Sequence, residues 1–581
     1  MPPNKLKSKI WNYFNKTGDK EAVCKICNKI LKTSGNTTNL RGHLENVHLQ
    51  QWQDSEAPSK KPRRVSNITD YIDVDTATTT PENDNKVDLP STSNNNVNVN
   101  PSTSSSSVKD IVLPQNSAMS QLFKTYIKNA ENYCITYDIW SEMMQNKSFV
   151  GITIHFLDKS QLLSGTLGVF ELTESHTSLY ITEKLTDIFA DWNISIEKVS
   201  AVITDNESTV KKVNRDMFGE KKIIPCFAHT INLVVTKSID DEKNCTELIS
   251  KVRDIVKYIK RSVNASDELR KRQIEMGLKE GHIKKMILDV RTRWNACFYM
   301  LQRFIELVSI VGAILLTRPE APPMVSSSEL DCVKEMIELL CPFEKLTKEF
   351  SGDTYVTVSK VIPLISCVRE VVENIKPKNE IIIQFKAEIK KQLARTFGNI
   401  EHSSILAIST TLDPRFKFMH FKDAVAKSKV INYLNKYLRE HNSLPTASDT
   451  SDESDKDDTE FDIWKYHKQL TQKNIKNKSS ATTTTGTITI SETEVQMYLS
   501  SPVTPIKRDA IEIWDDMKSL FPKLAKIAMI YLPIVATSVP SERLFSEAGA
   551  TITQERNRLL GTRLSKLLFL NSISKLLKTN K

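Results

Sequence analysis

Two pairs of metal-ligand residues lie near the start of the chain. Cys24 and Cys27 are separated by two residues, His43 and His48 by four, and 15 residues lie between the pairs. Two thiolates on a tight turn and two imidazoles near the end of a helix can complete a tetrahedron around Zn²⁺. Because a unit of this size buries little apolar surface, we expect a structural zinc to hold it folded.

The segment around these ligands is strongly basic. Residues 1–64 hold 13 Lys or Arg and 5 Asp or Glu, and the whole 581-residue chain has a net charge of +10. Concentrated positive charge favours a polyanion, since each phosphate contacted releases condensed counterions. An exposed, solvated tail is the alternative from charge alone. The cations expected to face phosphates are Lys25, Lys29, Lys32 and Arg41.

Two carboxylates follow apolar segments that we expect to be strands. Asp138 ends residues 133–138, and Asp205 follows Val202, Ile203 and Thr204. Carboxylates on a rigid sheet can hold Mg²⁺ or Mn²⁺, and a third acid would complete a two-metal site for phosphodiester cleavage. Taken alone, an Asp after a strand is also ordinary turn chemistry.

The pattern of apolar residues predicts a mixed α/β sheet followed by helices. Strands are expected at 133–139, 149–157, 167–172, 199–204 and 223–227, with a helix at 178–192 between the third and fourth. From Leu248 onward the apolar residues fall at helical spacing, and helical patterns dominate most of the remaining chain. No internal repeat of fixed period is present in the sequence.

Two polar stretches interrupt these patterns. Residues 65–116 are rich in Ser, Thr, Asn, Asp and Pro, which predicts a disordered linker. The acidic stretch 443–460 and the polar run 478–486 predict a flexible insertion. The basic cluster at 60–64, next to the linker, is typical of a nuclear import signal.

Several classes of protein are disfavoured by the sequence. The longest nearly apolar run, 307–316, is too short for a bilayer span of roughly 18 to 20 residues, and the polar start has no signal-peptide core. We therefore expect no membrane partner and no secretion by that route. Nine scattered cysteines do not form a disulfide framework and favour a reducing compartment.

The basic segment resembles a BED-type zinc finger. The resemblance rests on residues 8–14 (SKIWNYF), 24–27 (CKIC) and 40–48 (LRGHLENVH). It implies binding to double-stranded DNA through a zinc-dependent fold. Trp11 and Phe14 are expected to pack against the metal subdomain.

The rest of the chain, from about residue 120, resembles the hAT superfamily of DNA transposases. The matching words occur in the family's order: 137–141 (YDIWS), 151–156 (GITIHF), 203–206 (ITDN), 226–233 (CFAHTINL), 292–295 (TRWN), 412–417 (LDPRFK), 538–549 (SVPSERLFSEAG) and 555–559 (ERNRL). This resemblance implies a ribonuclease-H-like fold with a large helical insertion and a C-terminal dimerisation region, hence a homodimer or a higher homo-oligomer.

The resemblance also assigns roles to single residues. The resemblance makes Glu542 the third acid beside Asp138 and Asp205. Pro540 and Gly549 bracket a short helix, with Glu542 near its start. From the sequence alone, Glu542 would be a surface residue that the helix dipole favours. Trp294 matches an aromatic residue that supports a DNA hairpin, with a core residue as the alternative. His229 matches a residue near the active centre; half of a second zinc site with Cys226 is a weaker alternative because no partner pair appears.

The expected fold class is thus α/β plus all-α. The expected divisions are a small ββα zinc finger at 1–51, a linker at 52–116, a ribonuclease-H-like core at 117–245, a helical insertion at 246–442, a flexible insertion at 443–500 and dimerisation helices at 501–581. Leucines 564, 567, 568, 570 and 577 would pack against a second chain or, as readily, within one chain.

Three hypotheses of function remain open. The first is a nuclear, zinc-dependent DNA-binding protein derived from a hAT transposase, active in transcription or chromatin regulation and without chemistry. The second is an active transposase that cleaves DNA with Mg²⁺ or Mn²⁺. Two segments depart from the family's pattern, residues 207–210 and the Ile513–Trp514 pair. These departures favour the hypothesis of a DNA-binding protein without chemistry. A purely protein-recruiting module is the third, and none of the three requires a small-molecule substrate.

Overall fold

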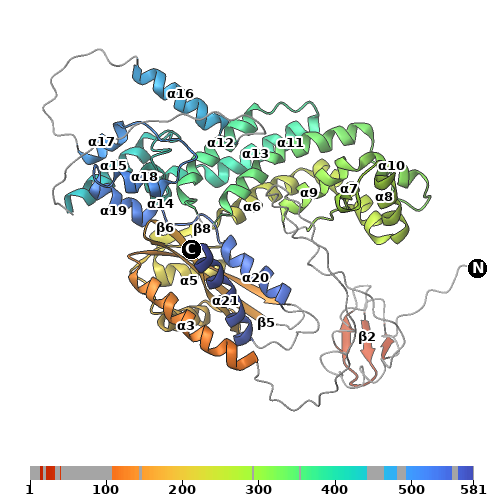
Figure 1. Cartoon of the computed structure of the whole chain (residues 1–581). Coiled ribbons are helices and arrows are strands. Elements are labelled where there is room, and N and C mark those ends of the chain that lie inside the picture. Colours follow the sequence, from red (N-terminus) through yellow and green to blue (C-terminus); the bar gives the residue numbers. More distant parts are fainter. Residues whose placement is uncertain are drawn as a thin grey trace, which may run out of the picture. The chain divides into compact units, whose positions relative to one another are not determined.

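The computed structural model describes residues 13–17, 21–32, 40, 43, 108–142, 147–290, 293–352, 355–440, 463–479, 493–551 and 561–579. The chain divides into two units, residues 1–96 and 97–581, which are treated separately below (Figure 1). The basic cluster at 60–64, the acidic stretch 443–460 and most of the predicted linker lie outside the described residues.

The first unit contains a small antiparallel sheet. Its strands are β1 (Phe14–Lys16), β2 (Glu21–Cys24) and β3 (Ile30–Lys32), in the order β1-β2-β3. The β2–β3 turn closes through a hydrogen bond from the Cys24 backbone N–H to the Lys29 carbonyl (3.0 Å). Asn28, at φ 58°, supplies the left-handed residue that this turn needs, since Asn tolerates that conformation better than most residues. Phe14, Ala22, Cys24 and Leu40 form the buried core.

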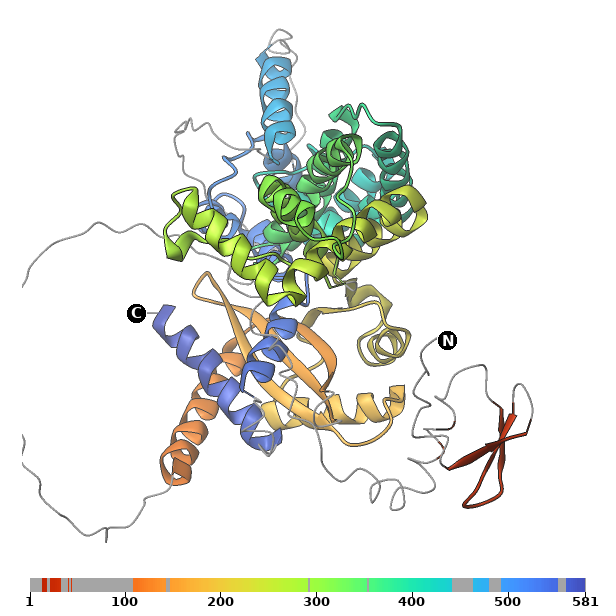
Figure 2. The ribbon, with the colours of Figure 1, turned by 90° about the vertical axis from the view of Figure 1, so that its right-hand side faces the viewer.

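The second unit begins with a five-stranded mixed sheet. Its order is β6-β5-β4-β7-β8; β4, β5 and β6 are antiparallel neighbours, and β7 and β8 run parallel to β4 (Figure 2). The strands are β4 (Tyr133–Glu142), β5 (Lys147–Asp158), β6 (Gln161–Leu172), β7 (Val199–Thr204) and β8 (Ile223–Pro225). All five predicted strands are present, and the predicted helix is α4 (Ser178–Trp192). The fifth strand stops earlier than expected, because Cys226 caps the helix that starts at Phe227.

Helices cover both faces of the antiparallel part of this sheet. On one face, Ile135 and Tyr137 pack with α3 (Val108–Asn129), α4 and α5 (Ser208–Phe218). On the other, Phe149 and Val169 pack against the C-terminal helices α20 (Val539–Thr551) and α21 (Gly561–Thr579). Alternate residues of a strand point to opposite faces, so neighbouring residues of β4 belong to different cores.

A bulge in β6 provides the docking point of α21. The β5–β6 register shifts between Ile152 and Thr153, which breaks the regular ladder near Leu167. Two backbone N–H groups at this irregularity donate to serine hydroxyls of α21, Thr166 to Ser572 and Val169 to Ser565, each at 3.1 Å. Gly168 (φ 153°) lies against Ser565, and a Cβ there would come within 2.7 Å of the serine oxygen. Helix α21 is therefore an integral cover of the sheet.

The remaining helices, apart from α16, share one large apolar core, which includes Tyr498 and Trp514. They are α6 (Phe227–Asp241), α7 (Lys243–Arg261), α8 (Val263–Glu275), α9 (Trp294–Glu306), α10 (Val308–Leu316), α11 (Ser327–Phe350), α12 (Val361–Asn374), α13 (Glu380–Phe397), α14 (Ser404–Leu412), α15 (Ala424–Glu440), α16 (Lys465–Ser479), α17 (Glu494–Ser500), α18 (Ala510–Met517) and α19 (Pro522–Tyr531). Short 3₁₀ turns lie at Glu220–Lys222, Glu280–His282, Val358–Lys360 and Ile400–His402.

Among the described residues no single helix is long and apolar enough to cross a membrane, although α9 and α10, bent by 73°, meet that criterion together.

Three expectations are corrected by these elements, and the packing of the C-terminal leucines, which was left open, is observed within one chain for Leu564 and Leu568. Helix α3 starts at Val108, inside the predicted linker, and α16 and α17 lie inside the predicted flexible insertion. Helix α17 forms there because a capping box at Thr493 starts it and because Val495 and Tyr498 are fully buried. Gly549 lies within α20 and not beyond its end. Leu564 and Leu568 are buried against the sheet of their own chain, whereas Leu567 is exposed.

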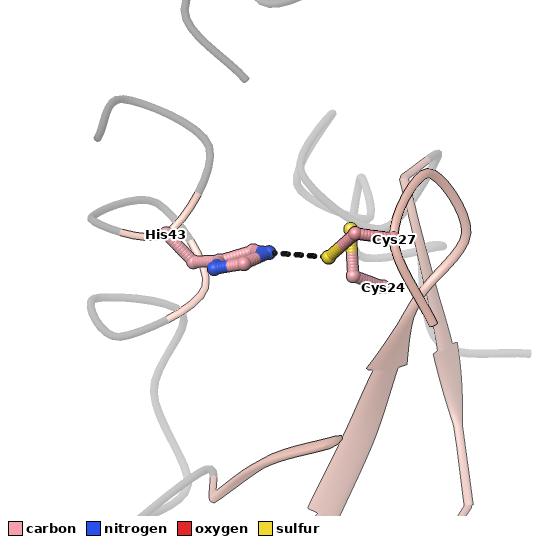
Figure 3. Close-up of side chains that lie close together, drawn as sticks. All are labelled: Cys24, Cys27 and His43. Atoms are coloured by element: carbon pink, nitrogen blue, oxygen red, sulfur yellow. Dashed lines mark hydrogen bonds between the residues drawn. The ribbon is translucent and has the colours of Figure 1, made fainter. Parts of the chain in front are cut away.

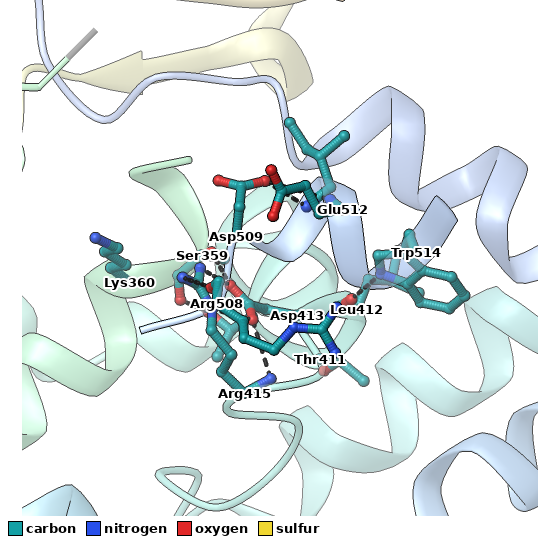
Figure 4. Close-up of polar contacts among 12 residues, drawn as sticks. Ser359, Lys360, Thr411, Leu412, Asp413, Arg415, Arg508, Asp509, Glu512 and Trp514 are labelled. Carbon is teal, nitrogen blue, oxygen red and sulfur yellow. Dashed lines mark hydrogen bonds and ion pairs between the residues drawn. The ribbon is translucent and has the colours of Figure 1, made fainter. Parts of the chain in front are cut away.

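The motif at 412–417 joins the middle of the chain to its C-terminal part. The buried Asp413 carboxylate accepts two hydrogen bonds from the Arg415 guanidinium (2.8 and 2.6 Å) and one from the Ser359 hydroxyl (2.6 Å), as Figure 4 shows. Arg415 also donates to the Arg508 carbonyl (3.1 Å), and the Trp514 indole N–H donates to the Leu412 carbonyl (2.6 Å). These bonds fix the segment that precedes α18 to the α14 end.

We expect Asp413→Ala to destabilise the second unit by about 3 to 5 kcal/mol, because the buried Arg415 loses its counter-charge. Chemical denaturation of the full chain measures the effect. The matched control is Asp516→Ala, which breaks an ion pair with Arg508 whose two side chains are about half exposed. That change should cost no more than about 1 kcal/mol. Equal effects of both substitutions would show that the buried pair has no special role.

Candidate functional site

Three of the four predicted zinc ligands come together in the first unit. Cys24 at the end of β2, Cys27 in the turn that follows, and His43 place their ligand atoms within 4.8 Å of one another (Figure 3). The Cys27 Sγ and His43 Nε2 atoms are 3.2 Å apart. Phe14 packs at the edge of the His43 ring, with ring centroids 6.1 Å apart, which confirms its expected position beside the ligands.

The chemistry of this donor set fits zinc. Bonds of about 2.3 Å to sulfur and about 2.0 to 2.1 Å to nitrogen in a tetrahedron separate neighbouring ligand atoms by roughly 3.5 Å. Cys24 and His43 are buried and Cys27 is exposed, as expected for a small site closed by a turn. His48, the predicted fourth ligand, lies outside the described residues, as does Trp11.

The predicted phosphate contacts are described in part. Lys25 and Lys29 lie in the exposed turn between the two cysteines and β3. Lys32 ends β3, and Arg41 lies outside the described residues. Lys25 and Lys29 therefore lie on the turn that carries Cys27 and directly follows Cys24.

Asp138 lies within β4, which continues to Glu142, so the expectation that it ends its strand is wrong; Asp205 directly follows β7. In the parallel β4–β7 pair, the register ends with Thr136 opposite Ile203, two residues before each acid. A buried network on the opposite face fixes this edge: Tyr137 donates to Asn214 (2.7 Å), which donates to Thr204 (2.8 Å). The Asp205 carboxylate accepts a hydrogen bond from the Glu207 backbone N–H (3.2 Å).

Helix α20 brings Glu542 to the same face of β4. The Ser541 hydroxyl lies 2.7 Å from the Thr136 hydroxyl and 3.3 Å from that of Thr153, and all three residues are buried. The helix approaches closely because Gly151 faces it: a Cβ at Gly151 would lie 2.9 Å from the Phe545 ring. Phe545 also stacks on Trp140, with centroids 5.4 Å apart.

The three acids lie close enough to interact electrostatically. The pKa of Asp138 is raised to about 7, first by burial and then by the negative charges of Glu542 and Asp205. Glu542 also forms an ion pair with Arg293 (3.6 Å). Within the described residues, however, the zinc-type cluster is the one His, Cys, Asp or Glu group whose ligand atoms all lie within 4.8 Å. The three carboxylates therefore do not form one such group as they are placed.

Two other predicted residues lie near these acids. His229 is in the first turn of α6, and its backbone N–H donates to the Cys226 sulfur (3.5 Å), which also accepts from the Ser538 N–H (3.3 Å). Burial raises the pKa of the Cys226 thiol to about 11. Among the described residues, Cys226 and His229 belong to no group of three metal-ligand side chains, which disfavours their interpretation as half of a second zinc site. Trp294 is 3% exposed and packs on Phe298 and Phe343. Of the two roles offered for it, this burial supports the core residue.

The sequence analysis missed the groups that position the acids. Ser541 and Thr136 lie next to or two residues from predicted acids, but small hydroxyl residues at such places carry no distinctive signal. Arg293 was part of a matching motif and received no role of its own. Its position directly before the predicted Trp294 was the available clue to the ion pair with Glu542.

Comparisons with protein families agree with this architecture. Residues 8–49 match the BED zinc finger, 136–224 the ZBED1 RNase-like domain, 224–339 the ZBED1 RNase-like helical domain and 494–573 the hAT family C-terminal dimerisation region. The chain thus combines a BED zinc finger with the sheet, helical and C-terminal regions of hAT-type proteins. In these regions the chain is similar to BED zinc-finger proteins and to hAT-type transposases.

Individual relatives have low sequence identity to the chain but align with about three quarters of its length. The chain is 24% identical to human Zinc finger BED domain-containing protein 4 over 78% of its own length and 38% of that protein. It is 23% identical to the Putative AC transposase of Zea mays (74% and 55%) and 24% identical to the Putative transcriptional regulator tpeD of Talaromyces stipitatus (75% and 52%). The chain therefore spans between about two fifths and just over half the length of these relatives.

We expect Asp138→Asn to stabilise the second unit at neutral and higher pH. The pKa of Asp138 is about 7 when folded and 3.8 ordinarily, so the folded state binds the proton more tightly and stability falls as pH rises from about 4 to 7. Asparagine keeps the acceptor for the Ile139 N–H and removes the charge. The gain should be on the order of 2 kcal/mol at pH 8 and vanish near pH 4.

Denaturation of the full chain at pH 5 and pH 8, without added Mg²⁺ or Mn²⁺, measures this difference. The control is Asp187→Asn, an exposed acid of α4, which should leave the pH dependence unchanged. If Asp138→Asn were no more stable than the native chain at pH 8, the three acids would not repel one another as described.

Proposed function

We propose that the chain is a nuclear, zinc-dependent DNA-binding protein derived from a hAT transposase, which acts as a homodimer in transcription or chromatin regulation. The observation that carries this proposal is the ligand cluster of Cys24, Cys27 and His43 on a turn that exposes Lys25 and Lys29. When bound, zinc supplies the cross-link that holds this small sheet and its helical ligand together. The lysines then meet DNA phosphates in a fixed orientation.

Two features support a regulatory role over DNA cleavage. The three acids do not form one group of ligand atoms within 4.8 Å, and Glu542 is paired with Arg293 (3.6 Å). One relative is named as a Putative transcriptional regulator, and another as a zinc finger BED domain-containing protein. The sheet and the helices would then serve as a body that carries the finger and joins two chains through the dimerisation region matched at 494–573.

We expect Cys24→Ser and His43→Ala to abolish sequence-preferring DNA binding, because either change removes a zinc ligand. Sites are first selected from random duplexes with the purified full chain, and affinity is then measured by gel shift. The loss should be about 10³-fold or more, the usual gap between specific and non-specific binding. Bound zinc, measured by elemental analysis, should fall from one atom per chain toward none.

The matched controls change the same residue types in the second unit. Cys341→Ser alters a half-buried thiol of α11, and His402→Ala removes an ion pair with Asp423. Both controls should retain zinc and DNA affinity. Native affinity in the Cys24→Ser or His43→Ala chain would refute the finger as the DNA-binding element.

The second candidate function is an active transposase. The observation in its favour is the convergence of Asp138, Asp205 and Glu542 on one face of the sheet, with the raised pKa of Asp138. Such acid clusters are costly to a fold and are typical of functional sites. Cleavage would require two Mg²⁺ or Mn²⁺ ions to bind between these carboxylates.

The two candidates differ in the effect of Asp205→Asn. If the chain cleaves DNA, this variant should lose nicking of the selected duplex in Mg²⁺ by at least about 10³-fold and keep native affinity. Asp216→Asn, which changes an exposed acid of α5, is the control and should cleave like the native chain. No nicking by the native chain on repeat-bearing duplexes, with binding intact, supports the non-catalytic function.

A further inference from the structure

A buried pair of histidines joins helix α16 to the rest of the second unit. His420 lies in the turns that follow α14, and His467 lies in the first turn of α16. The His420 Nε2 and His467 Nδ1 atoms are 2.9 Å apart, and each residue is 3% exposed. In a hydrogen bond between two imidazoles one ring donates and the other accepts, so the two facing nitrogens share a single proton. The contact therefore requires the accepting ring to be neutral.

Aromatic side chains surround the histidine pair. The centroid of the fully buried Phe416 ring lies 6.3 Å from that of His420 and 5.4 Å from that of His467. Trp464 stacks on Phe416 at 5.5 Å, and the Tyr466 ring lies 6.1 Å from the His420 ring. Such surroundings leave little water to solvate a charge, so they favour neutral imidazoles over imidazolium ions.

Helix α16 has few other anchors among its described side chains. Of residues 465–472, whose side chains are described, His467 is the buried one, and none of them belongs to the large apolar core. Ile463 and Trp464, directly before the helix, do pack in that core. Helix α16 lies against α12, and Figure 2 shows it, in light blue, projecting from the other helices. The docking of α16 therefore depends on the histidine pair and on these two residues.

The titratable groups around the pair come from three elements. They are Asp413 and Arg415 of the 412–417 motif, Cys367 and Glu370 of α12, and Lys465, Tyr466 and Lys468 of α16. Asp413 and Arg415 pair with each other (2.6 Å), Glu370 acts on Tyr466, and the two lysines are exposed. In the described parts of the chain none of these groups forms a hydrogen bond with His420, whose buried Nδ1 atom has no hydrogen-bond partner there.

A charge on His420 is therefore unfavourable while α16 is docked. The pKa of His420 is lowered from 6.5 to about 3, first by burial and then by His467. An imidazole in water keeps the ordinary pKa, so the released state binds a proton that the docked state resists. The docking of α16 is thus most stable above about pH 6.5 and loses stability as the pH falls from there toward 3.

We propose that protonation of the His420–His467 pair releases helix α16 from the second unit. A proton from solvent binds the accepting nitrogen, so both facing nitrogens then carry N–H groups and the bond between the two rings is lost. Release of the helix places both imidazoles in water, where a charge is solvated. This conformational change goes beyond the proposed function and does not require DNA.

Hydrogen exchange of the full chain at pH 7.5 and pH 5.5 tests this inference. The protection of the α16 amides, corrected for the intrinsic exchange rate, should be lower at pH 5.5. The decrease should be about tenfold if one histidine takes up a proton on release and up to about 100-fold if both do. Helix α13 of the same chain is the internal reference and should keep its protection.

Three variants separate the histidine pair from other effects of pH. The double variant His420→Phe/His467→Phe keeps two aromatic rings without a titratable group, so its α16 protection should be equal at both pH values. His467→Gln keeps a side-chain hydrogen bond to His420 and one titratable group, so its decrease should be smaller than the native one. The matched control is His282→Phe, which changes an exposed histidine and should behave like the native chain.

Two results would overturn the inference. The first is a native chain whose α16 protection does not depend on pH. The second is a double variant that keeps the native pH dependence. If the two phenylalanines leave α16 unprotected at both pH values, His467→Gln decides the question, and a decrease equal to the native one contradicts the role of the pair.

Discussion

The fold of the second unit depends on the contacts that residues 536–541 make with the sheet and with the helix α6. These contacts are called the seam below. Residues 536–541 are tied to the rest of the chain by the Phe227 N–H bond to the Ala536 carbonyl (3.0 Å), the Ser538 N–H bond to the Cys226 sulfur (3.3 Å) and the contact of Ser541 with Thr136 (2.7 Å). Buried polar groups that pair with one another specify a single arrangement, because any shift leaves them unsatisfied. Through this seam an acid some 400 positions later in the sequence reaches β4.

The same seam brings three acidic side chains together, and their mutual repulsion does not stabilise the fold. Asp138 is partly buried beside two other acids, and Arg293 compensates Glu542 from the start of α9. Folds retain such local conflicts mainly at functional sites. The clustered acids are therefore the part of the second unit that is hardest to explain by folding alone.

The sequence predicted the parts of the fold that depend on local patterns. Five apolar strand segments and the helix α4 were found at their expected places, since period-2 and period-3.6 patterns report burial directly. The disorder predictions failed at α3 and α17, where a few apolar residues such as Val495 and Tyr498 are stabilised by distant helices. The groups that position Glu542 were not predictable, because the pairing of Ser541 with Thr136 depends on tertiary structure.

The structure of the C-terminal region limits which of its residues can contact a second chain. Within the described residues of 494–573, Tyr498, Trp514, Leu564 and Leu568 are buried inside one chain. These side chains complete the helical core and cover the sheet, so they cannot also form the centre of a contact between two chains. Among the described residues of this region, the exposed large apolar side chains available to a partner are Met497, Leu520 and Leu567. A homodimer would thus join two already folded bodies and leave the seam at Ser541 intact.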